Sequence, residues 1–276
     1  MLKWLHSSNN PLKFRDNVVN QYIGLAPCAL AFERVLESRL YPTVLFARPI
    51  LDLGCGEGLF AHVVFAERID TGIDPDAREL ERARELGAYD ELIECFGEAI
   101  PKADGAYRTV FSNSVLEHIE HLPPVLKEVH RILAPGGFFH FTAPSPNFER
   151  FNWTSVVLAG LGLSRLDARW RAFFNRFWVH YHAYELARWE TLARDAGFEV
   201  VHSRTFAPRA SCLLNTTLTP FGLPAKFVKA ATNRWTLFPR LRRVLLFPLW
   251  LAAEPLLRGA EQAADGGLVF LSLRKT

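Results

Sequence analysis

The sequence predicts an α/β protein built on a doubly wound, Rossmann-like sheet. From Pro49 onward, short apolar runs alternate with amphipathic stretches at the spacing of βαβ units. The first of these runs leads directly into a glycine-rich loop, which is typical of the ligand-binding edge of such sheets. Turn residues stand at the expected boundaries, such as Gly87 after a helical stretch rich in Glu and Arg.

The expected elements follow one another along the chain. Residues 1–47 form a leading helical segment, because apolar residues recur there at helical spacing (Leu30, Val35, Leu36 and Leu40). The run Pro135-Gly136-Gly137 is expected to close a helix before a strand. Strands are expected at residues 49–54, 68–74, 90–96, 107–113, 136–144, 198–206 and 266–275, and further helices at 59–66, 76–86, 123–133 and 184–196.

The composition, 49% hydrophobic and 22% charged over 276 residues, is that of a folded globular protein. The cysteines lie far apart without a C-x-x-C pair, so we expect no zinc site and no disulfide framework, and we assign no metal ligands. The first residues lack the apolar core of a signal peptide, and no run of about 18 apolar residues occurs. We therefore expect a cytoplasmic protein with no cleaved signal and no spanning helix.

Residues 207–265 break the alternation and are expected to form a helical insertion between the last two strands. The chain would then comprise a leading segment (1–47), a core (48–206 and 266–276) and the insertion (207–265). Residues 205–259 carry eight basic residues against one acid, Glu254, among many Trp, Phe and Leu side chains. This pattern fits a peripheral contact with anionic lipids at the inner face of a membrane. The alternative is a helical cap with solvated arginines; nucleic acid fits poorly, because the arginines lie among apolar residues.

The glycine loop, ILDLGCGEG at residues 50–58, indicates a nucleotide-like cofactor, since glycines let backbone N–H groups approach a ligand. Two cofactor classes compete. Asp74 ends the second expected strand, where an acid can bind a ribose, as in nicotinamide dinucleotide sites. However, the loop reads G-x-G-x-G, and Asp52 and Glu57 would repel a diphosphate. A cationic ligand without phosphate, such as S-adenosylmethionine, suits these acids better.

Four motifs in order extend this interpretation: LDLGCGEG, GIDPD, YRTVFSNSVLEHI and LKEVHRILAPGGFFHFTAPSPN, within residues 49–146. The series resembles that of class I S-adenosylmethionine-dependent methyltransferases, and is most similar to the branch that methylates small molecules, quinones and lipids. The resemblance implies a seven-stranded sheet with an antiparallel last strand. It also implies S-adenosylmethionine as the cofactor and a small or lipid-linked methyl acceptor.

The resemblance also implies which residues hold the cofactor. Asp52, Gly54, Cys55 and Gly56 would surround its methionine part. Asp74, followed by Pro75, would bind the ribose hydroxyls, Glu98 and Ala99 would lie beside the adenine, and Asn113 would face the methyl group. The chain departs from its relatives at Tyr107 and Arg108, where an aromatic residue and an aspartate are common. That departure leaves open a non-catalytic protein that binds the cofactor or a membrane as a scaffold.

Methyl transfer is a direct displacement, so positioning and exclusion of water can supply most of the rate. A base near neutral pKa would assist an oxygen acceptor, and His180 and His182, in WVHYHAYE, precede a helix where such enzymes often contact substrate. His118 in VLEHI is a third candidate. Each histidine has a structural alternative, as a residue at the rim or packed against the sheet. We expect O-methylation, with a nicotinamide-dependent oxidoreductase as the alternative enzyme.

Overall fold

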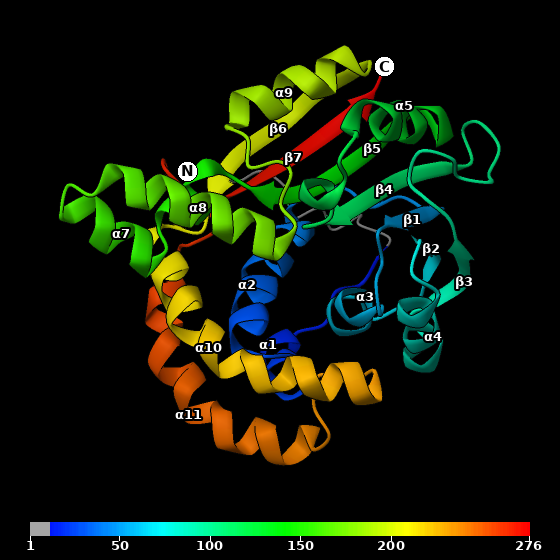
Figure 1. Cartoon of the computed structure of the whole chain (residues 1–276). Coiled ribbons are helices and arrows are strands. Elements are labelled where there is room, and N and C mark those ends of the chain that lie inside the picture. The colour runs from blue at the N-terminus through cyan, green and yellow to red at the C-terminus, as the bar shows by residue number, and fades with distance from the viewer. Residues whose placement is uncertain (1–11) are drawn as a thin grey trace.

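The computed structural model describes residues 12–276 (Figure 1). In this part of the chain a seven-stranded sheet has the order β3-β2-β1-β4-β5-β7-β6, and β7 runs antiparallel to both of its neighbours. The expected fold class is therefore confirmed, including the antiparallel last strand. The strands are β1 (Ile50–Leu53), β2 (Ile69–Asp74), β3 (Tyr89–Glu94), β4 (Tyr107–Asn113), β5 (Leu133–Pro144), β6 (Phe198–Phe206) and β7 (Leu268–Lys275).

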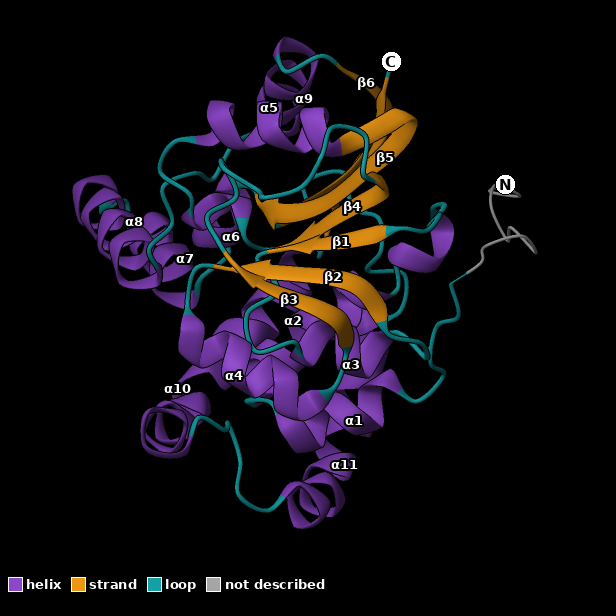
Figure 2. Cartoon of the chain, turned by 90° about the vertical axis from the view of Figure 1, so that its right-hand side faces the viewer, coloured by secondary structure: helices purple, strands orange, loops and turns teal. Residues whose placement is uncertain are grey.

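Helices cover both faces of the sheet (Figure 2). On one face, α5 (Leu122–Ile132) and α9 (Leu186–Asp195) bury apolar residues against β4, β5 and β7. On the other face, a second core includes α3 (Leu59–Val64) and α4 (Ala77–Leu86). Asp76 caps the start of α4 by accepting hydrogen bonds from two backbone N–H groups, and Gly87 ends it with a φ of 65°.

One boundary differs from the sequence prediction. Helix α5 ends at Ile132, and β5 begins at once at Leu133, which pairs with Tyr107. The run Pro135-Gly136-Gly137 lies inside β5, where the register with β4 shifts, rather than between the helix and the strand. Gly136 has a φ of 74°, so this glycine allows the backbone of β5 to adopt the left-handed conformation where the register shifts, instead of ending a helix.

The leading segment contains two helices, α1 (Val18–Leu25) and α2 (Cys28–Ser38), followed by a short 3-10 turn at Tyr41–Thr43. Pro27 lies between them, and Val35, Leu36 and Leu40 are buried as their spacing predicts. Residues 1–11, on which the expectation of no signal peptide largely depends, lie outside the described residues.

After β5 the chain forms three helices that no sequence pattern indicated: α6 (Pro146–Arg150), α7 (Trp153–Gly160) and α8 (Ser164–Trp178). Ser145 and Asn152 cap α6 and α7 through their side-chain oxygens. None of the residues of α8 is buried. The helix therefore has no apolar face packed on a core, which is the pattern by which a helix is usually predicted from sequence.

Between β6 and β7 the chain forms α10 (Arg209–Thr232) and α11 (Pro239–Leu257). Helix α10 packs against α2, and α11 packs against α1. Both long helices contain prolines and change direction along their length (Figure 1), as expected where a proline removes a backbone hydrogen bond. Among residues 12–276, no helix is both long enough and apolar enough to cross a bilayer.

Candidate active site

A cavity of about 510 Å³ lies where the parallel strands β1 and β4 end. Residues of α2, α8, α10, the glycine loop and the segment after β4 line it. Its volume lies in the range of about 300–1,000 Å³ that is typical of small-molecule sites. The carboxyl edge of a parallel sheet is the usual position for a ligand in this fold.

The glycine loop forms one wall of the cavity through Gly54, Cys55 and Gly56. Gly54 has a φ of 76°, and a Cβ atom there would lie 2.4 Å from a methyl carbon of Val115. Gly56 has a φ of 51°, and a Cβ atom there would have no neighbour within 4 Å. Glycine is thus required at position 54 by packing, whereas at position 56 it leaves the backbone open to a ligand.

Two acids flank the loop. Asp52 is buried, lines the cavity and accepts a 2.6 Å hydrogen bond from the hydroxyl of Tyr89. Burial raises the pKa of Asp52 to about 7. Asp74 accepts hydrogen bonds of 2.9 Å from the backbone N–H groups of Gly56 and Asp76. Burial also raises the pKa of Asp74. Asp74 is not among the residues that line the cavity, but its hydrogen bond from Gly56 connects it to one that does.

The sequence-predicted cofactor residues thus fall into two groups. Asp52, Gly54, Cys55, Gly56 and Asn113 line the cavity together. The residues predicted to hold the ribose and the adenine lie outside the cavity lining: Asp74, Pro75, Glu98 and Ala99. Asp74 is half-buried, and the other three are exposed.

Asn113, at the end of β4, is fixed by α2. Its Nδ2 donates to the carboxylate of Glu37 at 2.8 Å, and its Oδ1 accepts from the hydroxyl of Tyr41 at 3.0 Å. Glu37 is fully buried, and it also accepts hydrogen bonds from Ser114 at 2.5 Å and Thr142 at 3.0 Å. No local pattern in the sequence indicates this network, although a buried carboxylate needs such donors.

Glu37 forms an ion pair with Arg34, which also lies 3.4 Å from Glu33. Arg34 and Glu33 both line the cavity. Burial raises the pKa of Glu33 to about 7, and Asn215 of α10 donates to its carboxylate at 3.1 Å. The only sequence signal for these residues was a set of charges within an otherwise apolar helix.

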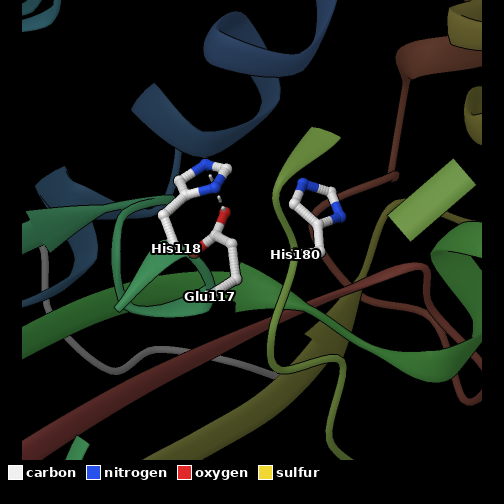
Figure 3. A group of neighbouring side chains, drawn as sticks. All are labelled: Glu117, His118 and His180. Atoms are coloured by element: carbon white, nitrogen blue, oxygen red, sulfur yellow. Dashed lines mark ion pairs between the residues drawn. The ribbon is translucent and has the colours of Figure 1, made fainter. Parts of the chain in front are cut away.

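The candidate catalytic histidines do not lie together. His118 and His180 line the cavity, with ring centroids 5.2 Å apart, and Glu117 lies beside them (Figure 3). Burial lowers the pKa of both histidines, that of His180 to about 4, and raises the pKa of Glu117 to about 8. His182 lies outside the lining, with its Nε2 at 2.8 Å from the carbonyl oxygen of Ile119.

Helix α10 and the residues after it close over the glycine loop. Lys229 lies 2.8 Å from the carboxylate of Glu79 and 3.7 Å from that of Glu57. The ring of Trp235 packs against Lys229, and its indole N–H donates to Glu57. We call these contacts the α10 clasp. The basic segment is visible in the sequence, whereas nothing in the sequence indicates this contact with the cofactor loop.

Residues 31–203 match the sequence model of a protein family described as a methyltransferase domain. The chain belongs to this methyltransferase family. The match runs from α2 through most of β6, so it includes the glycine loop, Asn113 and the histidines. It confirms the resemblance to class I S-adenosylmethionine-dependent methyltransferases and favours S-adenosylmethionine over a nicotinamide cofactor.

Two curated relatives of this methyltransferase are O-methyltransferases. Malonyl-[acyl-carrier protein] O-methyltransferase of Enterobacter lignolyticus is 32% identical over 132 residues, which cover 48% of this chain and 47% of that protein. Ubiquinone biosynthesis O-methyltransferase of Pectobacterium atrosepticum is 28% identical over 173 residues, which cover 60% of this chain and 70% of that protein. The chain spans about half the length of several of the curated relatives it matches.

A solved structure supports the fold of the methyltransferase. Phosphoethanolamine N-methyltransferase 2 of Haemonchus contortus, in complex with S-adenosyl-L-methionine, has a TM-score of 0.52 and 16% identity. The match covers 93% of this chain and 56% of that chain. At this identity the likeness establishes the shared fold and not a shared acceptor.

Proposed function

We propose that this protein transfers the methyl group of S-adenosylmethionine to an oxygen atom of a small or lipid-linked acceptor. One observation carries the proposal: the glycine loop, Asn113 and the pair His118 and His180 line a single cavity. Cofactor and acceptor groups can therefore meet in one cavity. The names of the two curated relatives, both O-methyltransferases, support oxygen as the acceptor atom.

The residues present fit the cofactor. A Cβ atom at Gly56 would meet nothing, so its backbone is open, and a cationic ligand beside the buried Asp52 would favour the ionised form of that carboxyl. When bound, S-adenosylmethionine supplies a methyl group on a sulfonium; a C–O bond forms, the C–S bond breaks, and a thioether remains. Asp52 and the loop from Gly54 to Gly56 would hold the methionine part and Asp74 the ribose. Pro75, Glu98 and Ala99 would lie beside the nucleoside.

The chain's own residues would prepare the acceptor. Asn113, fixed by Glu37 and Tyr41, would hold its amide toward the methyl group. His118 and His180 would act at the acceptor hydroxyl, which must lose its proton as the C–O bond forms. His182 has no place in this proposal, because its Nε2 is directed at backbone carbonyl oxygens. Within the domain division proposed above, residues 207–265 would close the cavity.

A cytoplasmic protein that binds the inner face of a membrane through residues 205–259 is part of the proposal. Helix α11 packs on α1, yet many of its apolar side chains are exposed at helical spacing, among them Leu241 (58%), Val244 (71%) and Leu245 (66%). Basic residues interleave with them, as a surface for anionic lipid requires. A lipid-linked acceptor could then reach the cavity without leaving the membrane.

Vesicle flotation tests the membrane contact. The double variant Leu241→Glu and Leu245→Glu should lose binding to vesicles that contain anionic lipid. The matched control Val201→Glu, at a residue that is 51% exposed on β6, should retain it. Equal flotation of the double variant and the wild type would remove the membrane from the proposal, whereas equal binding to neutral and anionic vesicles would contradict the role of the basic residues.

Methyl transfer is tested with labelled S-adenosylmethionine and a panel of phenols, carboxylic acids and lipid extracts. The proposal expects a labelled ether or ester product and release of S-adenosylhomocysteine. Binding of the cofactor without turnover on any acceptor would favour the scaffold alternative, for which Tyr107 and Arg108 are the sequence signal.

A further inference from the structure

Three side chains with metal-ligating atoms converge at the wall of the cavity (Figure 3). Glu117 and His118 belong to the short 3-10 turn after β4, and His180 lies in the segment after α8. One ligand atom from each lies within 4.8 Å of the other two. We propose that Glu117, His118 and His180 bind one divalent transition-metal ion, with zinc as the first candidate.

The side chains of the cluster carry buried polar atoms without a protein partner among the described residues. Glu117 is only 2% exposed, yet its Oε2 is buried without a hydrogen-bond partner among the described residues. The Nδ1 atom of His180 is also buried without a hydrogen-bond partner among the described residues. A buried polar atom without a partner costs about 1–3 kcal/mol, so native structures rarely leave one unexplained. The His180 ring turns its other nitrogen toward Glu117 and His118 (Figure 3), so an ion among the three side chains would be bound by that nitrogen and by a carboxylate oxygen of Glu117.

The orientation of His118 supports the same conclusion. Its Nδ1 lies 3.1 Å from the carbonyl oxygen of Val179, so Nδ1 carries the proton and Nε2 keeps its lone pair. Nε2 lies 3.9 Å from Oε1 of Glu117, and the dashed line in Figure 3 joins this pair. A backbone acceptor on the second ring nitrogen is the usual way in which proteins orient a metal-binding histidine.

Charge also favours a cation. Arg34 is the basic side chain whose field reaches Glu117, but it is already paired with Glu37 and Glu33. Two imidazole nitrogens and one carboxylate oxygen form a donor set that suits zinc and related divalent ions, with further coordination positions left open. Because all three residues line the cavity, an open position would face the acceptor.

The role of the ion in catalysis rests on the proposed function, whereas its binding does not. A divalent ion polarises a bound oxygen and lowers its pKa. The acceptor hydroxyl would release its proton to solvent as its oxygen binds the ion, and the oxidation state of the ion would not change. His118 and His180 would then prepare the acceptor through the ion rather than by taking the proton themselves.

Titration of the chelator-treated full chain with Zn²⁺ and Co²⁺ tests the site. The wild type should bind one equivalent, and Co²⁺ should give the visible absorption of a site with nitrogen and oxygen ligands. Glu117→Gln and His180→Gln should each weaken binding at least about tenfold, given what loss of a supporting residue alone costs such sites. His121→Gln, at an exposed histidine outside the cluster, is the matched control and should bind as the wild type does.

Two results would overturn the metal site: no stoichiometric binding by the wild type, or equal binding by the wild type and both cluster variants. Circular dichroism and binding of S-adenosylhomocysteine verify that each variant is folded. The same measurement separates this inference from the proposed function. Retained S-adenosylhomocysteine binding and methyl transfer in a protein that binds no metal would overturn the metal site alone, whereas loss of cofactor binding in the wild type would overturn the proposed function.

Discussion

Asn113 donates a hydrogen bond of 2.8 Å to Glu37, which joins the end of β4 to helix α2 in the leading segment. The two residues are far apart in the sequence, and Glu37 is completely buried. The leading segment is therefore more than a cover for the sheet. It holds the residue that we propose to face the transferred methyl group, and it contributes Glu33 and Arg34 to the cavity wall.

Replacement of Glu37 should therefore destabilise the protein strongly. Glu37→Gln removes the closer of the two carboxylates paired with Arg34, leaving only Glu33 at 3.4 Å, and turns an amide N–H₂ toward groups that themselves donate. We expect a loss of about 3–5 kcal/mol in the free energy of unfolding, measured by urea titration. Glu81→Gln, on the exposed face of α4, should change stability by less than about 0.5 kcal/mol. A similar small effect at position 37 would contradict the role of the network.

A pair of glycines separates backbone strain from ligand binding. Gly56 and Gly87 both have positive φ, 51° and 65°, and a Cβ atom at either would meet nothing within 4 Å. Alanine at each position should cost a similar amount, roughly 1–2 kcal/mol. Only Gly56→Ala should weaken S-adenosylhomocysteine binding, by at least about tenfold in calorimetry, because only Gly56 lines the cavity. Equal binding by the two variants would place the cofactor elsewhere.

Acid should destabilise the fold through His140. This side chain is fully buried in β5, and burial lowers its pKa from 6.5 to about 4. As the pH falls, His140 takes up a proton in the unfolded state before it does so in the folded state. The free energy of unfolding is therefore unaffected by the titration of this histidine above pH 6.5 and decreases as the pH falls from 6.5 toward 4. Between pH 7 and 4 the wild type should lose about 3 kcal/mol more than His140→Gln does. Parallel pH profiles in denaturant titrations would exclude this histidine as a cause.

The α10 clasp should slow cofactor release. Trp235→Ala removes both the indole donor to Glu57 and the ring that packs on Lys229. We expect S-adenosylhomocysteine to dissociate several times faster in stopped-flow experiments, with intermediate rates for Trp235→Phe, which keeps the ring but loses the donor. If Trp235→Ala and the wild type release the ligand at the same rate, the clasp only closes the surface.

Much of the sheet could be predicted because the relevant signals are local. The strands β4 and β6 match their predicted residues in full, since apolar runs bounded by turn residues need no knowledge of distant contacts. Helices α6 to α8 could not be predicted in this way. Their apolar side chains remain largely exposed, so the sequence lacks the alternation of buried apolar and exposed polar residues that marks an amphipathic helix.

The candidate site was predictable only where residues near in sequence act together. The glycine loop and Asp52 lie in one motif, whereas the Glu37 network and the cluster of Glu117 with His180 form only when distant segments meet. The motif WVHYHAYE made His180 and His182 appear equivalent. The structure separates them, because only His180 reaches the cavity while His182 contacts backbone carbonyl groups.

The central claim, a cavity that binds S-adenosylmethionine, is tested most directly by calorimetric titration with four ligands: S-adenosylmethionine, S-adenosylhomocysteine, NADH and NADPH. The wild type should bind the first two and neither of the others, and bound ligand should raise the melting temperature. Asp74→Ala should abolish binding while the protein stays folded. Binding of a nicotinamide cofactor, binding of none of the four, or unchanged affinity in Asp74→Ala would contradict the account.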